Sequence, residues 1–197
     1  MHDLDGSLNA AWKDSFKNGG VGVNDVEEWN FTISEKKDVF NSEEYGAENV
    51  HTDHKNGESS NRFDVPTEDK HPVGIAHTHP YSTAEGGYTG VGFSFGDIDN
   101  MRNWTSEEGA VSIAEAGTKR FALVITDKAK ATSFFSNHSS ASIEGTWKAE
   151  FNNPNNSNLS FAEKVDKANK AVIGNGTASG ISMYVTDDAK KLNFKKL

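Results

Sequence analysis

The chain has 197 residues, a length that predicts one domain spanning residues 1–197. Its formal net charge of -9 disfavours nucleic acid and anionic membranes as partners, because both recruit basic patches. The absence of cysteine excludes disulfides, thiol catalysis and zinc sites with cysteine ligands.

The chain shows no targeting signal in its sequence. Residues 1–6 lack the basic start and apolar stretch of a secretory signal peptide, and no apolar run approaches the length of a membrane span. The localisation therefore stays open: we expect either a cytoplasmic protein or one domain of a larger exported protein.

The first part of the chain predicts one helix and one clear strand. Apolar residues recur at helical spacing from Leu8 to Phe16, so a helix is expected over 8–18 with Ser7 as its cap. In residues 27–33, apolar and polar residues alternate as in a half-buried strand. We further expect a turn at 34–37, a short strand at 38–40, and a long surface connection over 41–72 with one strand near 61–65.

The rest of the chain alternates between strongly and weakly patterned segments. Strands are predicted at 73–76 and 121–126, and helices at 97–107 and 161–172. The pattern of 111–116 is ambiguous. We also expect a second strand at 131–135, an irregular loop over 136–160, and a closing hairpin formed by 181–185 and 192–194.

The run His77-Thr78-His79-Pro80 ends the predicted strand at 73–76. Residues i and i+2 of a strand point to the same face, so two imidazoles are available to one metal ion. Farther along, Ser94 and Asp97 precede the predicted helix, where Ser is a good cap and Asp suits the positive helix start. A capped helix is also a rigid way to aim a carboxylate, so the structural and metal-binding interpretations are compatible.

Together, His-x-His-Pro followed by Ser-x-x-Asp resembles the motif of the JAMM zinc metalloprotease family, also called MPN+ or JAB. The resemblance runs from the strand that contains Glu27 and Glu28 to the helix after Asp97. It implies an α+β fold with a curved, mostly antiparallel sheet flanked by helices in a cytidine-deaminase-like layering. The chain is also similar to JAB-type domains of bacterial polymorphic toxins, which implies an immunity protein as partner if it is a toxin domain.

The same resemblance implies a zinc-dependent peptidase or isopeptidase with a protein or peptide substrate. His77, His79 and Asp97 would ligate Zn²⁺ and leave one position for water. An upstream glutamate would act as general base, and Ser94 would donate a hydrogen bond to the developing oxyanion.

Glu28 is the preferred general base. The strand pattern puts it opposite the apolar face of Trp29, Phe31 and Ile33, whereas Glu27 would share that face at a higher cost for a charge. Glu43 and Glu44 are distant second choices.

Two other functions stay open. One is a catalytically silent module that acts by binding, and the other is a different His-x-His hydrolase such as a metal-dependent phosphoesterase, for which Asp127 and His138 are candidate extra ligands. We expect His51 and His54 to be solvated. The segment 81–93 is longer than the usual spacing of the family, and we expect Tyr81, Tyr88 and the glycines of this segment to form a flap over the cleft.

Overall fold

The computed structural model describes residues 4–16, 28–37, 43–51, 71–80, 90–174, 176–186 and 194–197. These residues form an α+β fold around one seven-stranded sheet with the order β2-β1-β3-β4-β5-β6-β7. β3 and β4 are parallel, and the other neighbouring strands are antiparallel. The predicted fold class, a mostly antiparallel sheet flanked by helices, is thereby confirmed. The elements are α1 (Leu4–Asp14), β1 (Asn30–Lys37), β2 (Glu43–His51), β3 (His71–Thr78), α2 (Phe95–Asn100), η2 (Met101–Trp104), β4 (Val111–Glu115), β5 (Arg120–Ile125), α3 (Lys128–Asn137), α4 (Ser140–Phe151), η3 (Pro154–Asn156), α5 (Phe161–Ile173), β6 (Ile181–Thr186) and β7 (Lys195–Lys196).

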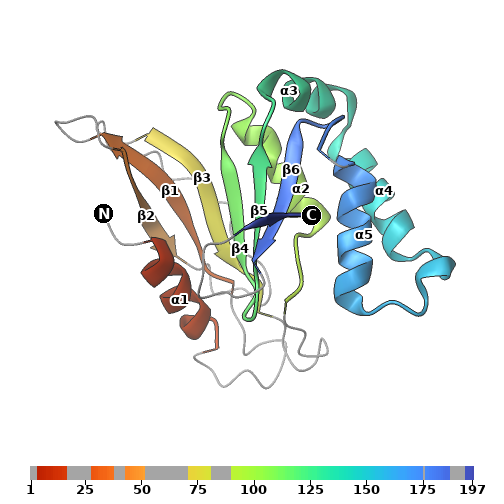
Figure 1. Cartoon of the computed structure of the whole chain (residues 1–197), viewed down its shortest axis with the longest axis horizontal. Helices are drawn as coiled ribbons and strands as arrows, with labels where there is room; N and C mark the ends of the chain where they lie inside the picture. The colour runs from red at the N-terminus through yellow and green to blue at the C-terminus, as the bar shows by residue number, and fades with distance from the viewer. Residues whose placement is uncertain are drawn as a thin grey trace.

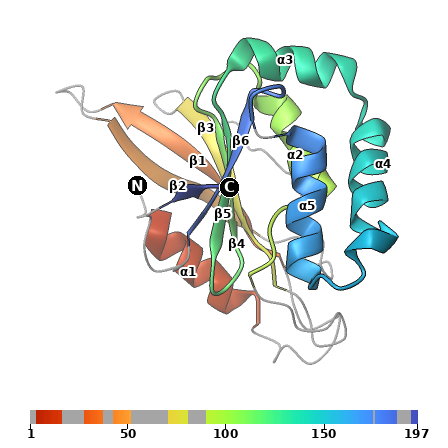
Figure 2. The ribbon, with the colours of Figure 1, turned by 45° about the vertical axis from the view of Figure 1, so that its right-hand side comes forward.

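Helices cover both faces of the sheet (Figures 1 and 2). On one face, α1 buries Leu8 and Ala11 against Phe31 and Ile33 of β1. On the other face, α2, α4 and α5 pack over a larger apolar cluster that includes Phe121. The sheet therefore separates two hydrophobic cores, and β3 lies among its inner strands between them.

Close packing of β3 against β4 depends on one glycine. A Cβ atom at Gly74 would stand 2.0 Å from the carbonyl oxygen of Val111, so only glycine permits the two strands to approach this closely. The parallel register then pairs His77 with Ala114 and Thr78 with Glu115.

The secondary-structure predictions agree with the structure in segments that have strong hydrophobic patterns. The strands at β5 and β6 and the helix at α5 match the expected ranges, and the helix after Asp97 is formed by α2 and η2. The ambiguous segment 111–116 forms β4. The N-terminal helix is present but begins before Ser7, which lies inside α1 and is therefore not its cap. No helix among the described residues is long and apolar enough to cross a membrane.

Two predictions for the first half of the chain are wrong. Residues 34–37 belong to β1 and are not a turn, and residues 43–51 form β2 within the expected surface connection. Both segments are polar and lack the apolar alternation that predicts a strand. They form strands because their backbones pair with neighbouring strands, which a local sequence pattern does not reveal. The predicted strands at 38–40 and 61–65 lie outside the described residues.

Two predictions for the second half are also wrong. The expected strand at 131–135 is part of α3, whose N-cap Asp127 accepts a hydrogen bond from the Lys130 amide, and Ala131 and Phe135 are buried at helical spacing. The expected loop over 136–160 contains α4 and η3. α4 is rich in polar residues, and only the burial of Ile143 and Trp147, four residues apart, reveals its apolar stripe.

Candidate metal centre

β3 and the residue just after it deliver the two histidines. His77 lies on β3 and is 3% exposed, and His79 follows the strand and is 5% exposed. The amide of His79 donates to the carbonyl of Glu115 at 2.8 Å, so pairing with β4 continues past the end of β3. This pairing keeps the chain extended, and the two imidazoles therefore share the face that α2 covers.

Asp97 is aimed at the histidines by the first turn of α2. Ser94 is the N-cap: its hydroxyl and its amide both donate to Asp97 Oδ2, at 2.8 and 2.7 Å, and the Asp97 amide donates back to the hydroxyl at 3.3 Å. This reciprocal capping box fixes the carboxylate against the helix start. The predicted cap and the predicted ligand are thus the same local structure.

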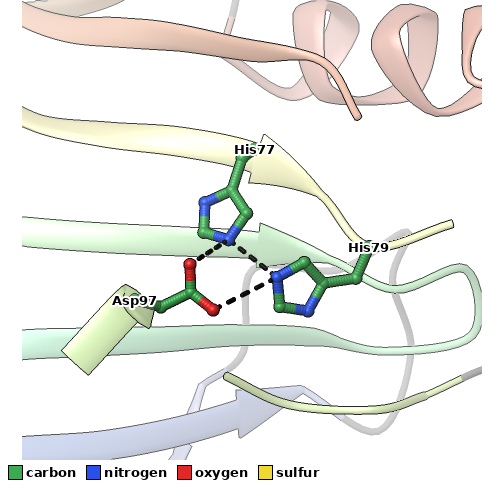
Figure 3. Close-up of side chains that lie close together, drawn as sticks. All are labelled: His77, His79 and Asp97. Carbon is green, nitrogen blue, oxygen red and sulfur yellow. Dashed lines mark hydrogen bonds and ion pairs between the residues drawn. The ribbon is translucent and has the colours of Figure 1, made fainter. Parts of the chain in front are cut away.

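The three side chains converge on one point (Figure 3). His77 Nε2 lies 3.1 Å from Asp97 Oδ1, His79 Nε2 lies 3.4 Å from Asp97 Oδ2, and the two Nε2 atoms are 2.9 Å apart. In the part of the chain that the structure describes, this is the one group of three such side chains whose ligand atoms all lie within 4.8 Å of one another. The site combines residues from β3 and α2 that are 18 positions or more apart in sequence.

The surroundings of His79 determine which ring nitrogen faces the site. Its Nδ1 lies 3.1 Å from the carbonyl oxygen of Gly92, which can only accept, so Nδ1 carries the proton. Nε2 is then the nitrogen directed at the other two side chains, as in many histidine ligands. The buried ring of Phe93 packs near both imidazoles, with centroid distances of 6.1 and 6.3 Å.

The charges of the site reinforce one another. Burial alone would lower the pKa of His79, but the hydrogen bond and charge of Asp97, the charge of Glu28 and a backbone contact raise that pKa to about 9. Burial alone would raise the pKa of Asp97, and the two histidines instead hold it well below its usual value. The geometry therefore stabilises a cation between imidazole and carboxylate.

Glu28 lies beside His79, across the pairing of β1 with β3. The register pairs Asn30 with His77, and Trp29 hydrogen bonds with Thr78, so Glu28 comes opposite His79 and on the same face. The charge of Glu28 contributes to the raised pKa of His79, in agreement with this placement.

The other glutamates that the sequence offered as the general base either lie farther from the histidines or fall outside the described residues. Phe31 and Ile33 are buried on the opposite face, with Trp29 packed at its edge, as the alternation predicted. Glu43 and Glu44 pair with the far end of β1, at Lys37 and Lys36, away from His77. Glu27 lies outside the described residues.

The three converging residues fit a divalent metal ion. Two imidazole nitrogens and one carboxylate form a donor set for zinc and other first-row divalent metals. Ligands about 2.0–2.1 Å from a tetrahedral zinc are about 3.3 Å apart, close to the separations found here. Three protein ligands would leave one position open for water. Asp97, whose side chain is 18% exposed, is the most exposed of the three.

The remaining predicted site residues do not join this group. Asp127 caps α3 and His138 stacks on Phe134, so neither supplies a ligand to the three. Of the expected flap, residues 81–89 lie outside the described residues, as do the side chain of His51 and all of His54. The carbonyl of Gly92 could not be predicted as a contact of His79, since no sequence pattern marks a backbone acceptor.

A separate cavity of about 360 Å³ lies at the opposite end of β3. It is lined by His71 and Val73 of that strand, together with residues of β1, β4 and the start of α1. It belongs to the face that α1 covers and does not reach His77 or His79.

Comparisons with protein-family models, curated proteins and solved structures find no match to this chain.

Proposed function

We propose that the chain is a zinc-dependent peptidase or isopeptidase. The observation that carries the proposal is the convergence of His77, His79 and Asp97 with Glu28 beside them. A metal held by three protein side chains, with a carboxylate alongside as a general base, is an arrangement that can activate water for the hydrolysis of an amide.

The protein side chains divide the work between binding and proton transfer. His77, His79 and Asp97 would hold the ion, which when bound supplies a Lewis acid and lowers the pKa of its water to about 7. Glu28 accepts a proton from the attacking water as its oxygen bonds to the carbonyl carbon. When the C–N bond breaks, Glu28 returns that proton to the leaving amine nitrogen.

Ser94 enters the proposal first as a positioning residue. Its hydroxyl proton is donated to Asp97, so this hydroxyl orients a metal ligand. The oxyanion role implied by the family resemblance stays a prediction, because it requires the same proton to turn toward the substrate.

The proposal is tested by a pair of glutamate variants, one just before β1 and one within it. We expect the wild-type protein to contain about one zinc per chain by elemental analysis. Glu28→Gln should keep that zinc and lose about 10²–10⁴-fold in turnover of a fluorogenic peptide library or an isopeptide-linked ubiquitin dimer. Glu35→Gln is the matched control, since Glu35 pairs with His71 at the far end of β1. This variant should leave both the zinc content and the turnover unchanged.

Three results would separate the proposal from its alternatives. A wild-type protein without metal contradicts a metalloenzyme, and two metals per chain favour a phosphoesterase-like site. One zinc with no hydrolysis of either substrate favours a silent binding module. Undiminished turnover in Glu28→Gln would refute the assignment of the base.

A further inference from the structure

A buried hydroxyl joins the two strands that carry the proposed site. Thr78 lies between His77 and His79 and is fully buried. Its amide donates to the carbonyl of Trp29 at 2.9 Å, and its Oγ1 accepts the amide proton of Trp29 at 3.0 Å. Both backbone groups of Trp29 are thus bound to one residue, at the point where β1 begins.

The hydroxyl of Thr78 is in turn held by Ser15, the residue that directly follows α1. Because Oγ1 accepts from Trp29, its own proton is available to Ser15 Oγ, 2.8 Å away. Ser15 Oγ donates to the carbonyl of Ala11 at 2.9 Å, which completes a consistent series of donors and acceptors. Ser15 and Thr78 are 1% and 0% exposed, so each hydroxyl depends on the other for a partner that water cannot replace.

The backbone and the side chain of Thr78 have different roles. Its side chain points to the face that α1 covers, while His77 and His79 point to the opposite face. Its backbone therefore holds the histidines, and its hydroxyl holds Trp29, whose preceding residue is Glu28. Displacement of Trp29 would move Glu28 relative to His79 without removing any metal ligand.

We propose that Thr78 and Ser15 are positioning residues that hold Glu28 in place beside His79. This inference rests on the proposed role of Glu28 as general base. Proton transfer requires donor and acceptor within hydrogen-bond distance, and a displacement of about 1 Å can cost roughly 10²-fold in rate. A hydroxyl that fixes the backbone next to the base therefore acts on turnover and not on metal binding.

The test compares Thr78→Val, which keeps the shape and removes the hydroxyl, with Thr78→Ser, which keeps the hydroxyl. For Thr78→Val we expect one zinc per chain, unchanged KM for the peptide that the wild type cleaves, and kcat lower by about 10- to 100-fold. Hydrogen exchange of the Trp29 amide should become about 2- to 10-fold faster, as for the loss of one net hydrogen bond. Thr78→Ser should restore both values.

Two further variants guard against a general loss of folding. Ser15→Ala, remote in sequence from every ligand, should lower kcat less than Thr78→Val does, because Thr78 still accepts from Trp29. Ser112→Ala is the matched control: Ser112 is buried on β4, and its hydroxyl has no hydrogen-bond partner within the described part of the chain. It should change neither kcat nor the exchange of Trp29.

The outcomes distinguish this inference from the proposed function. Absence of hydrolysis in the wild type refutes the base and with it the positioning role. An active wild type with unchanged kcat and Trp29 exchange in Thr78→Val refutes the positioning role alone. Loss of zinc from Thr78→Val and Ser15→Ala in parallel with kcat, with zinc retained in Thr78→Ser, would show that the hydroxyls support the metal ligands, which also overturns the inference.

Discussion

In the proposed site, a proton would compete with a metal ion for the space between His77, His79 and Asp97. When no cation is bound there, the pKa of His79 near 9 keeps its ring protonated at neutral pH, with Nε2 directed at His77 and Asp97. Ligation needs the lone pair of that nitrogen, so metal binding has to release this proton. The same electrostatics that favour a proton at this position favour a divalent cation.

Ser94 offers a test of how far this site depends on the carboxylate orientation. Ser94→Ala removes the hydroxyl that donates to Asp97 Oδ2, so we expect a zinc affinity lower by about 10- to 100-fold. Loss of the N-cap should also cost about 0.5–2 kcal/mol in the free energy of unfolding. Zinc titration calorimetry and urea unfolding measure the two effects.

The matched control is Ser160→Ala, because Ser160 and Glu163 form the same capping box at the start of α5. It should lose similar stability and keep full zinc affinity. Equal zinc affinities in the two variants would show that Ser94 is only a helix cap.

Asp166 gives a pH-dependent prediction with a defined sign. Burial raises its pKa above the ordinary 3.8, against the opposing charges of Lys119 and Lys170. The folded protein therefore binds this proton more tightly than the unfolded chain, and stability falls as pH rises from about 3.8 through the raised pKa. Asp166→Asn removes this loss. In urea unfolding, the stability of the variant should therefore increase relative to that of the wild type as pH rises across that range.

Glu163 on the same helix provides the opposite case. Its hydrogen bonds with Ser160 lower its pKa below 4.5, so its contribution is present above that value and is lost as pH falls. The free energy of unfolding of Glu163→Gln should therefore become lower than that of the wild type as pH rises. If Asp166→Asn behaves in the same way, burial does not control the ionisation of Asp166.

At the scale of elements, a buried arginine with two carboxylate partners fastens α1 to the sheet. Arg120 of β5 is fully buried and donates to Glu115 of β4 and to Asp5 of α1. Burial alone would lower the pKa of Arg120, and its hydrogen bonds with both carboxylates raise it. These contacts lie on the same face as Ser15, so α1 is held at both ends.

Arg120→Met should destabilise the protein by about 3–5 kcal/mol, because Glu115 then stays buried without a cation. The double variant Arg120→Met with Glu115→Leu should recover much of that loss, since no unpaired charge remains. Urea unfolding of the wild type, the single variants and the double variant gives the coupling energy. Additive losses would mean that the two residues act independently in spite of their contact.

At the scale of the whole molecule, the site joins elements that are distant in sequence. β1, β3 and α2 all contribute to it, and a ligand that binds only their folded arrangement stabilises the entire fold. Zinc at about 100 times its dissociation constant should add about 2.7 kcal/mol, and each kcal/mol corresponds to roughly 2–4 °C in Tm for a chain of this size.

Thermal unfolding with zinc and with a chelator measures this shift. Asp97→Asn is the control, because it keeps the size of the side chain and loses the charge, and its Tm should respond little to zinc. An equal shift in both proteins would place the bound zinc elsewhere in the chain.

The amino-acid sequence was enough to predict the candidate site residues and the elements with strong hydrophobic patterns. The i, i+2 spacing of His77 and His79 requires a shared face on any strand, and the alternation around Trp29 placed Glu28 opposite the apolar face. Helix α5 and strands β5 and β6 were predictable because their own apolar residues repeat at the period of the element.

Features that depend on contacts between distant segments could be seen only in the folded structure. β2 and the second half of β1 are strands because neighbouring backbones pair with them, and α4 is a helix whose short apolar stripe is recognisable only against the core that covers it. The meeting of Asp97 with the histidines, and of Glu28 with His79, follows from strand register and from the docking of α2. Local sequence carries no information on either, since both are set by burial and hydrogen bonds across the sheet.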